Sequence, residues 1–188
     1  IEYGMIADPK FFERAEKFLL LKDTEGKYYT LEEYKKQIEE NQKNKDGRLV
    51  YLYATNADEQ YSNIENAKSK GYNVLLLDGI LDAHFISTLE QKYGDCQFAR
   101  VDSASIDKLI EKEEESKESK LNDEQKESVK KAFEEIIDKT SFNVEFSNLS
   151  ETDAPVEVIQ NEFMRRMKEM SAMNGMSMWG GMPDSYTL

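Results

Sequence analysis

Between residues 48 and 110, short apolar runs alternate with longer, mostly polar segments, and few folds accommodate that order. The runs 49–53 and 74–77 are rich in aliphatic residues and tyrosine, which favour strands. The segments 59–70 and 81–92 have the length of helices, and a glycine closely follows each one, as is common at helix ends. Two strands and two helices in this order predict a parallel strand pair joined by a right-handed crossover. We therefore expect a small, helix-flanked α/β unit here.

The segment before this unit carries the signals of two helices. Asp8 can accept hydrogen bonds from the first N–H groups of a helix, and Pro9 suits its first position. The apolar residues that follow form one stripe at helical spacing: Phe11, Phe12, Ala15, Phe18 and Leu19. A second helix is expected after a turn over residues 23–27, because Thr30 and Glu33 have the spacing of a capping box.

The segment 111–120, EKEEESKESK, contains no apolar residue and predicts a boundary between two domains. Beyond it, Asn122 and Gln125 can cap a helix. The apolar face of that helix would carry Val129, Ala132, Phe133, Ile136 and Ile137. Alternating residues predict a half-buried strand over 142–146, and a further strand over 156–158. The second domain is therefore expected to be an α+β unit.

Composition restricts the compartment and the partners. The net charge of −13 argues against nucleic acid or an anionic membrane as the main partner. The single cysteine, Cys96, cannot form an internal disulfide, and we expect it to fill space in the core of a protein from a reducing compartment. No apolar run has the length of a membrane span, and no signal segment opens the sequence. We expect a cytoplasmic protein, and the start at Ile1 and the end within an expected strand suggest part of a longer chain.

The residues give no support for catalysis in this chain. Neither common phosphate-binding motif is present, GxGxxG after a strand or GxxxxGK[ST]. One histidine, His84, and one cysteine cannot assemble a structural zinc site, so we expect His84 to be hydrogen-bonded near the core. We predict no catalytic residue, cofactor or metal. The alternative is a small α/β enzyme with a ligand site at the carboxyl ends of strands 49–53 and 74–77, supported by Asp78 and Asp82 alone.

Seven of the eight methionines lie within residues 164–182, MRRMKEMSAMNGMSMWGGM. Those that recur every third residue fan across about half the circumference of a helix. Burying one methionine stabilises a protein by roughly 1.5–3 kcal/mol, so exposing four forgoes an amount comparable with the stability of a domain. Interleaved charges nevertheless oppose complete burial: Arg165, Arg166, Lys168 and Glu169. Because methionine adapts to many apolar shapes, we predict a promiscuous protein-binding surface made by Phe163, Met164, Met167, Met170, Met173, Met176 and Trp179.

Three other interpretations of this segment stay open. In the first, the segment is an ordinary core helix in which methionine is flexible filler. In the second, the MxxM and MxM spacings provide thioether ligands for copper(I). Copper sites of that kind usually serve exported proteins, and the sequence shows no export signal. The segment also resembles the methionine-rich signal-sequence binder of protein targeting, but that module is basic and sits on RNA, whereas this chain is acidic.

Several spaced stretches resemble the bacterial heat-shock protein 90 chaperone family. They are DPKFF at 8–12, LLKDT at 20–24 with YTLEEY at 29–34, VYLY at 50–53 and GYNVLLL at 71–77. Residues 149–156, followed by an amphipathic helix, resemble the opening of that family's C-terminal domain. The resemblance covers nearly the whole chain and rests on several stretches rather than one motif.

The resemblance implies that residues 1–115 are the helical connector and small α/β subdomain of the chaperone's middle domain, and that residues 116–188 begin its α+β dimerisation domain. In that family an exposed amphipathic helix of the second domain contacts client proteins, and the segment 163–173 matches its place. The implied partners are unfolded or partly folded clients. The implied parent is a homodimer that uses ATP and Mg²⁺ through a domain outside this sequence.

The sequence also departs from the family pattern. A Pro-Ile-Asp-Glu-like turn after the second predicted strand is replaced by Gly-Ile-Leu-Asp-Ala at 79–83, so no role of that glutamate is transferred. The Asn-x-Ser-Arg-Glu loop, whose arginine reaches the ATP γ-phosphate, and the last dimer helices are missing from the sequence. We expect this chain to contribute client contact and interdomain linkage without ATP hydrolysis, and to be monomeric by itself.

Overall fold

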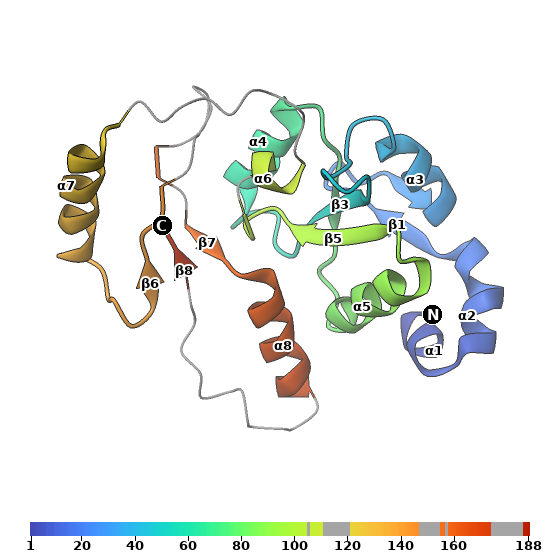
Figure 1. The fold of residues 1–188 in the computed structure, drawn as a ribbon. Helices are drawn as coiled ribbons and strands as arrows, with labels where there is room; N and C mark the ends of the chain where they lie inside the picture. The colour runs from blue at the N-terminus through green and yellow to red at the C-terminus, as the bar shows by residue number, and fades with distance from the viewer. Residues whose placement is uncertain (105, 111–120, 147–154, 157, 174–185) are drawn as a thin grey trace. The chain divides into compact units, whose positions relative to one another are not determined.

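The computed structural model describes residues 1–104, 106–110, 121–146, 155–156, 158–173 and 186–188. The chain divides into two compact units, Ile1–Lys112 and Glu113–Leu188, which are described separately (Figure 1). The expected linker at 111–120 lies outside the described residues.

A three-stranded parallel sheet forms the centre of the first unit. Strand β3 (Leu49–Ala54) lies between β4 (Val74–Leu76) and β5 (Cys96–Arg100), and both neighbours run parallel to it. Every residue of β3 is buried, as expected for a parallel strand covered on both faces. The predicted parallel pair is confirmed. Strand β5 was not predicted, because its sequence mixes polar and apolar residues directly after a helix.

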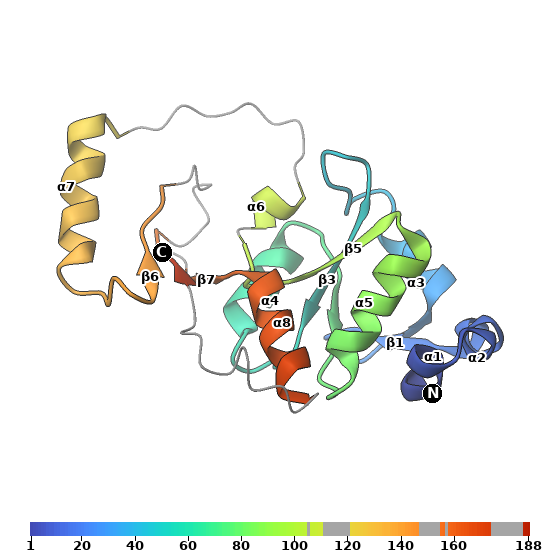
Figure 2. The ribbon, with the colours of Figure 1, turned by 60° about the horizontal axis from the view of Figure 1, so that its bottom comes forward.

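Two apolar cores lie on the two faces of this sheet. Alternate residues of β3 face them: Leu49, Tyr51 and Tyr53 belong to one core, and Val50, Leu52 and Ala54 to the other. The first core also takes residues from four helices: α1 (Glu2–Ala7), α2 (Pro9–Ala15), α3 (Leu31–Ile38) and α5 (Asp82–Tyr93). The second takes residues from α4 (Tyr61–Ser69), and Leu109 of α6 (Ile106–Leu109) packs against it. The helices surround the sheet in Figure 2, which confirms the α/β class for this unit.

The first helix signals are confirmed in part. The Asp8 carboxylate caps α2 by accepting a hydrogen bond from Lys10 N at 2.8 Å, and Pro9 is the first residue of that helix. The helix ends at Ala15, however, and a short 3₁₀ helix, η1 (Glu16–Phe18), follows. The expected single apolar stripe is therefore wrong: Phe12 and Leu19 are buried, whereas Phe18 is 73% exposed because the change of helix type turns it outward.

The predicted turn at 23–27 connects an antiparallel hairpin of β1 (Leu20–Lys22) and β2 (Tyr28–Thr30). These strands were not predicted, because the leucines of β1 extend the apolar pattern of the preceding helix. Gly26 in the turn has φ of +83°, a left-handed conformation that favours glycine. The predicted capping box follows: Thr30 N donates to Glu33 Oε2 at 2.8 Å, and Glu33 N donates to Thr30 Oγ1 at 3.3 Å.

A row of four aromatic rings crosses the first core. The ring centroids of Tyr29 and Tyr34 are 5.6 Å apart, those of Tyr34 and Tyr51 are 5.4 Å apart, and those of Tyr51 and Phe98 are 4.7 Å apart. The row links β2, α3, β3 and β5. Offset or edge contacts of this kind contribute beyond simple burial.

The second unit is an α+β unit, as predicted. Helix α7 (Asp123–Glu134) begins with the predicted capping box, in which Gln125 N donates to Asn122 Oδ1 at 2.8 Å. Three strands of two residues each form a mixed sheet in the order β6-β8-β7: β6 (Phe142–Asn143), β8 (Tyr186–Thr187) and β7 (Ile159–Gln160). Helix α8 (Glu162–Met173) follows β7.

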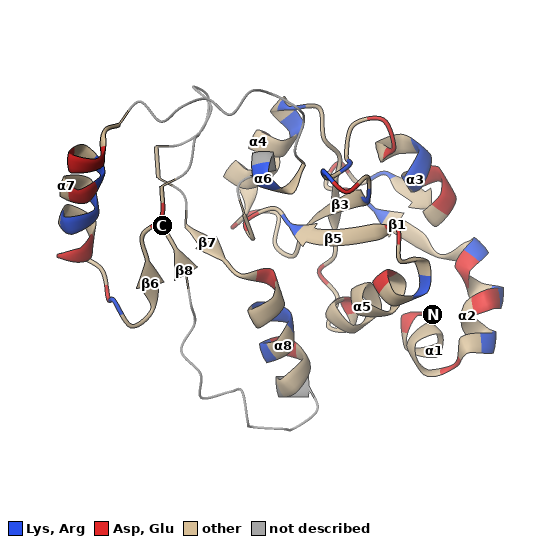
Figure 3. Ribbon diagram, in the orientation of Figure 1, with Lys and Arg blue, Asp and Glu red and all other residues tan. Residues whose placement is uncertain are grey.

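The sequence overestimated the regular structure of this unit. The strand expected over 142–146 is limited to β6, and Val156 lies in a bend before β7 rather than in a strand. Ile136 and Ile137 lie beyond the end of α7, and Ile136 is 80% exposed. Among the described residues of this unit, only Val144 and Arg165 are buried. Charged residues are interspersed with other residues along α7 and α8 (Figure 3).

Candidate functional site

Residues 164–173 of the methionine-rich segment lie in helix α8 (Glu162–Met173), as predicted, and the rest of the segment lies outside the described residues. Asn161 precedes the helix, and its Oδ1 accepts a hydrogen bond from Met164 N at 3.1 Å. This contact satisfies one of the N–H groups that lack a partner at a helix start. Glu162 lies in the first turn, where a carboxylate interacts favourably with the helix dipole.

The charges of α8 form a ladder of ion pairs. Arg165 Nη2 lies 3.0 Å from Glu162 Oε1 and also pairs with Glu169, one turn further along. Arg166 Nε lies 2.7 Å from Glu162 Oε1. Arg165 is only 6% exposed. The sequence analysis expected the charged residues of this segment to oppose burial. That expectation is wrong for Arg165, which is buried because the carboxylates of Glu162 and Glu169 compensate its charge.

The apolar side of α8 is only partly covered. Phe163 is 69% exposed and Met164 is 37% exposed, whereas Met167 and Met170 are half-buried. Phe163 and Arg165 are two residues apart, so they lie about 200° apart around the helix. The exposed ring and the buried, paired cation therefore occupy opposite sides of α8.

The remaining residues of the predicted surface are not placed. Met173 is the last residue of α8, but its side chain is not among those described. Met176 and Trp179 lie outside the described residues. Four of the seven predicted positions, Phe163, Met164, Met167 and Met170, are thus on one helix, all with some solvent exposure.

The carboxyl ends of β3 and β4, where the enzyme alternative placed a ligand, offer one buried acid. Asp82 is 7% exposed, and its Oδ2 accepts a hydrogen bond from Gly79 N at 2.8 Å. Burial raises the pKa of the Asp82 carboxyl to about 6, against the effect of that hydrogen bond. Asp78 is exposed. The charges of Glu2 and Asp78 raise the pKa of Asp82 further. A cluster of carboxylates alone does not favour the enzyme alternative.

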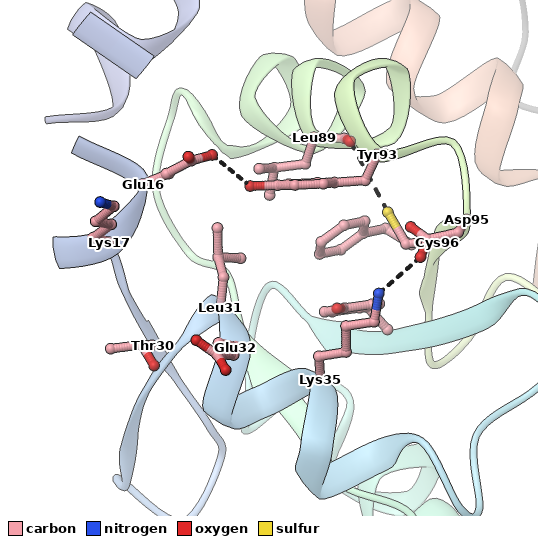
Figure 4. Close-up of a pocket in the computed structure, with 12 residues that line it drawn as sticks. Glu16, Lys17, Thr30, Leu31, Glu32, Lys35, Leu89, Tyr93, Asp95 and Cys96 are labelled. Carbon is pink, nitrogen blue, oxygen red and sulfur yellow. Dashed lines mark hydrogen bonds and ion pairs between the residues drawn. The ribbon is translucent and has the colours of Figure 1, made fainter. Parts of the chain in front are cut away.

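Cys96 and His84 have no catalytic arrangement. Cys96 is buried, as predicted, and burial raises the pKa of its thiol to about 11, which keeps it protonated at neutral pH. His84 is half-buried on α5, and its Nδ1 has no hydrogen-bond partner in the described part of the chain, so the expectation of a hydrogen-bonded histidine is wrong. A cavity that was not predicted lies beside Cys96, at the amino end of β5 (Figure 4). The residues that line this cavity come from segments far apart in the sequence, so no local sequence pattern predicts the cavity.

The model of the family described as Hsp90 protein matches residues 1–185. The chain belongs to the Hsp90 family. The resemblance seen in the spaced sequence stretches is thereby confirmed for the whole chain. None of the helices in the described ranges is long and apolar enough to span a membrane.

The relatives are bacterial Hsp90 proteins. The chain is 50% identical over 192 residues to the chaperone protein HtpG of Bacteroides thetaiotaomicron, and 47% identical over 192 residues to that of Porphyromonas gingivalis. Each alignment covers the whole chain and 28% of the relative, so the chain spans little more than a quarter of these proteins. The HtpG of Helicobacter acinonychis is 33% identical over 185 residues. Among solved structures, the middle domain of a Plasmodium falciparum putative heat shock protein matches with 22% identity and a TM-score of 0.42, covering 55% of this chain and 43% of that one.

Proposed function

We propose that this chain is part of an ATP-dependent chaperone and that α8 contacts unfolded or partly folded client proteins. The observation that carries the proposal is the exposure of Phe163 and Met164 on a helix that instead buries the paired Arg165. Membership of the Hsp90 family supplies the class of partner. The cytoplasm, a homodimeric parent, and the absence of nucleic-acid and membrane partners belong to the same proposal.

The chemistry of α8 suits weak binding to many sequences. Unbranched methionine and an exposed phenyl ring can pack against apolar segments of different shapes. Their half-exposed state means that each contact buries only part of a side chain. Because ordering an unfolded partner has an entropic cost, the net affinity for any one segment is expected to be modest. A chaperone that must release its clients requires such an affinity.

The proposal assigns no nucleotide site to this chain. Neither phosphate-binding motif occurs in the sequence, and the described residues contain no group of three or more His, Cys, Asp or Glu side chains that could hold a metal ion. We therefore assign ATP and Mg²⁺ to the parts of the longer protein outside this sequence. The role left to this chain is client contact and linkage between domains.

The test is the affinity of the 188-residue chain for a permanently unfolded protein, such as reduced and carboxymethylated α-lactalbumin, measured by fluorescence anisotropy. Replacing Phe163 and Met164 with Ser should weaken binding about tenfold, which corresponds to about 1.4 kcal/mol. The matched control is Phe18→Ser, which removes an equally exposed phenyl ring from the first unit and should leave the affinity unchanged. A wider variant with Ser at Met164, Met167, Met170 and Met173 should weaken binding further. Equal affinities in all variants, with unchanged circular dichroism spectra, would show that α8 does not contact the unfolded protein.

A further inference from the structure

A cavity of about 610 Å³ opens on the face of the first unit's sheet that carries α3 and α5 (Figure 4). All of its lining residues belong to the first unit. The apolar part of the lining is Leu31, Tyr51, Leu89, Tyr93, Cys96 and Phe98. This volume lies within the range of about 300–1,000 Å³ that is typical of sites for small molecules.

The lining offers flat aromatic surface. Tyr51 and Phe98 are stacked, with ring centroids 4.7 Å apart and planes inclined by 28°. In Figure 4, Tyr93 and Leu89 bound the open space on one side and Lys35 bounds it on the other. Because an engineered cavity of about 150 Å³ already holds one benzene ring, this cavity has room for two or three rings. A single apolar side chain of a peptide would leave most of it unfilled.

Most polar groups on the rim already have partners. Tyr93 Oη donates to Glu16 Oε2 at 3.0 Å, and Lys35 Nζ lies 2.8 Å from Asp95 Oδ2. An ammonium has three N–H donors, so Lys35 can bind a second acceptor without leaving Asp95. Three carboxylates line the rim, those of Glu16, Glu32 and Asp95, and they would repel a ligand with several negative charges, such as a nucleotide.

We propose that this cavity binds a compact molecule of two or three rings that carries one anionic group, with the rings between Tyr93 and the Tyr51–Phe98 stack and the anion at Lys35. The size of the cavity admits this number of rings. Two lysines, Lys17 and Lys35, and three carboxylates line the cavity, and this net negative lining limits the ligand to one anionic group. None of the lining residues belongs to α8, and the proposal does not rest on the function proposed for that helix.

The chain contains its own reporter for this site. Cys96 is the only cysteine of the sequence, it lines the cavity, and it is 7% exposed. Its Sγ donates a weak hydrogen bond to the carbonyl oxygen of Leu89 at 4.0 Å, so the thiol lies against the wall that a ligand would cover. Because this thiol is buried and protonated, its alkylation by N-ethylmaleimide is slow, and the rate reports how often the cavity wall at Cys96 becomes accessible.

The probe is 8-anilinonaphthalene-1-sulfonate, which has three rings and one sulfonate, and the matched neutral probe is N-phenyl-1-naphthylamine. Saturating the 188-residue chain with the sulfonate should slow alkylation of Cys96 at least fivefold, as followed by mass spectrometry. Lys35→Met should weaken binding of the sulfonate about two- to fivefold and leave the neutral probe unaffected. The control is Lys131→Met on α7, which breaks an exposed ion pair, 2.9 Å from Glu127, between two residues that do not line the cavity, and it should change neither affinity.

A second variant tests the cavity itself. Leu31→Trp places a large ring in the opening and should abolish protection of Cys96 by both probes, whereas Ile80→Trp at a position that is 82% exposed should not. If Leu31→Trp fails to fold, the Lys35→Met variant still tests whether the anionic group binds at Lys35. The Lys35 side chain is 48% exposed, so its replacement leaves the core intact. Probe fluorescence without protection of Cys96, or equal protection in the Lys35→Met and Lys131→Met variants with the sulfonate at subsaturating concentration, would overturn the proposal.

Discussion

Asp23 shows how one buried carboxylate organises a turn. It is 1% exposed, and it accepts hydrogen bonds from the backbone N–H groups of Glu25 and Lys27 and from the side chains of Tyr29 and Asn73. Burial alone would raise the pKa of Asp23, but these hydrogen bonds outweigh it and lower the pKa below the ordinary value. The ionised form is therefore the one that the fold requires.

Replacing Asp23 with Ala should lower the free energy of unfolding by about 2–4 kcal/mol, because four donors lose their acceptor. Since the folded-state pKa is lowered, the stabilisation is fully present above the unfolded pKa of about 4 and is lost as the pH falls through the folded value. Urea unfolding at several pH values measures both effects. The control is Asp58→Ala at an exposed position, which should change stability by less than about 0.5 kcal/mol. A loss in Asp23→Ala as small as in the control would contradict this account.

Asp82 should show the opposite pH dependence. Burial raises its pKa to about 6, so the folded state holds a proton that the unfolded state releases at lower pH. Stability from this residue therefore decreases as the pH rises from about 4 to 6. Asp82→Asn keeps an acceptor for Gly79 N and removes the buried charge, so it should stabilise the chain by about 1–3 kcal/mol at pH 7.5 and by almost nothing at pH 4. Urea midpoints at the two pH values compare the variants, and a destabilised Asp82→Asn chain at pH 7.5 would refute the assignment.

At the scale of the element, α8 depends on its ion-pair ladder. Arg165→Met should lower the stability of this helix by about 3 kcal/mol, because Arg165 is buried between Glu162 and Glu169. Amide hydrogen exchange within 162–173 measures the effect locally. Lys131→Met on α7 is the control: its pair with Glu127, at 2.9 Å, has both side chains 69% exposed and should contribute less than about 1 kcal/mol. Equal increases in exchange within the two helices would show that burial of Arg165 adds nothing.

The elements that could be predicted are those whose signals are local. The capping boxes at Thr30 and Asn122 fix the starts of α3 and α7, and the continuous apolar run of β3 identifies a buried parallel strand. The β1–β2 hairpin was hidden because its apolar residues continue the period of α2, and its stability depends on the distant Asn73. The cavity could not be predicted at all, since its walls come from residues 16 to 98 and only the tertiary fold brings them together.

At the scale of the whole molecule, the two units differ in how much they bury. The first has a core on each face of its sheet, whereas the described residues of the second bury only Val144 and Arg165. On the burial of its described residues, the second unit is expected to be marginally stable by itself. The free energy of the first unit should therefore dominate any cooperative unfolding transition of the chain.

Native-state hydrogen exchange should show this difference. Amides of β3, β4 and β5 should open only through global unfolding, and those of α7 should exchange at least about a hundredfold faster. Thr30→Ala removes a helix cap, which should lower the free energy of unfolding of the first unit by about 1 kcal/mol and so lower the midpoint of the main thermal transition. Asn122→Ala should leave that midpoint unchanged. If both substitutions lowered the same transition equally, the two units would have to unfold as one.

The row of rings from Tyr29 to Phe98 gives the core of the first unit a spectroscopic signal. Aromatic groups held in fixed, asymmetric contact produce strong near-ultraviolet circular dichroism, and that signal disappears when their packing loosens. Loss of this signal on heating would therefore follow the loosening of that core without attaching a dye.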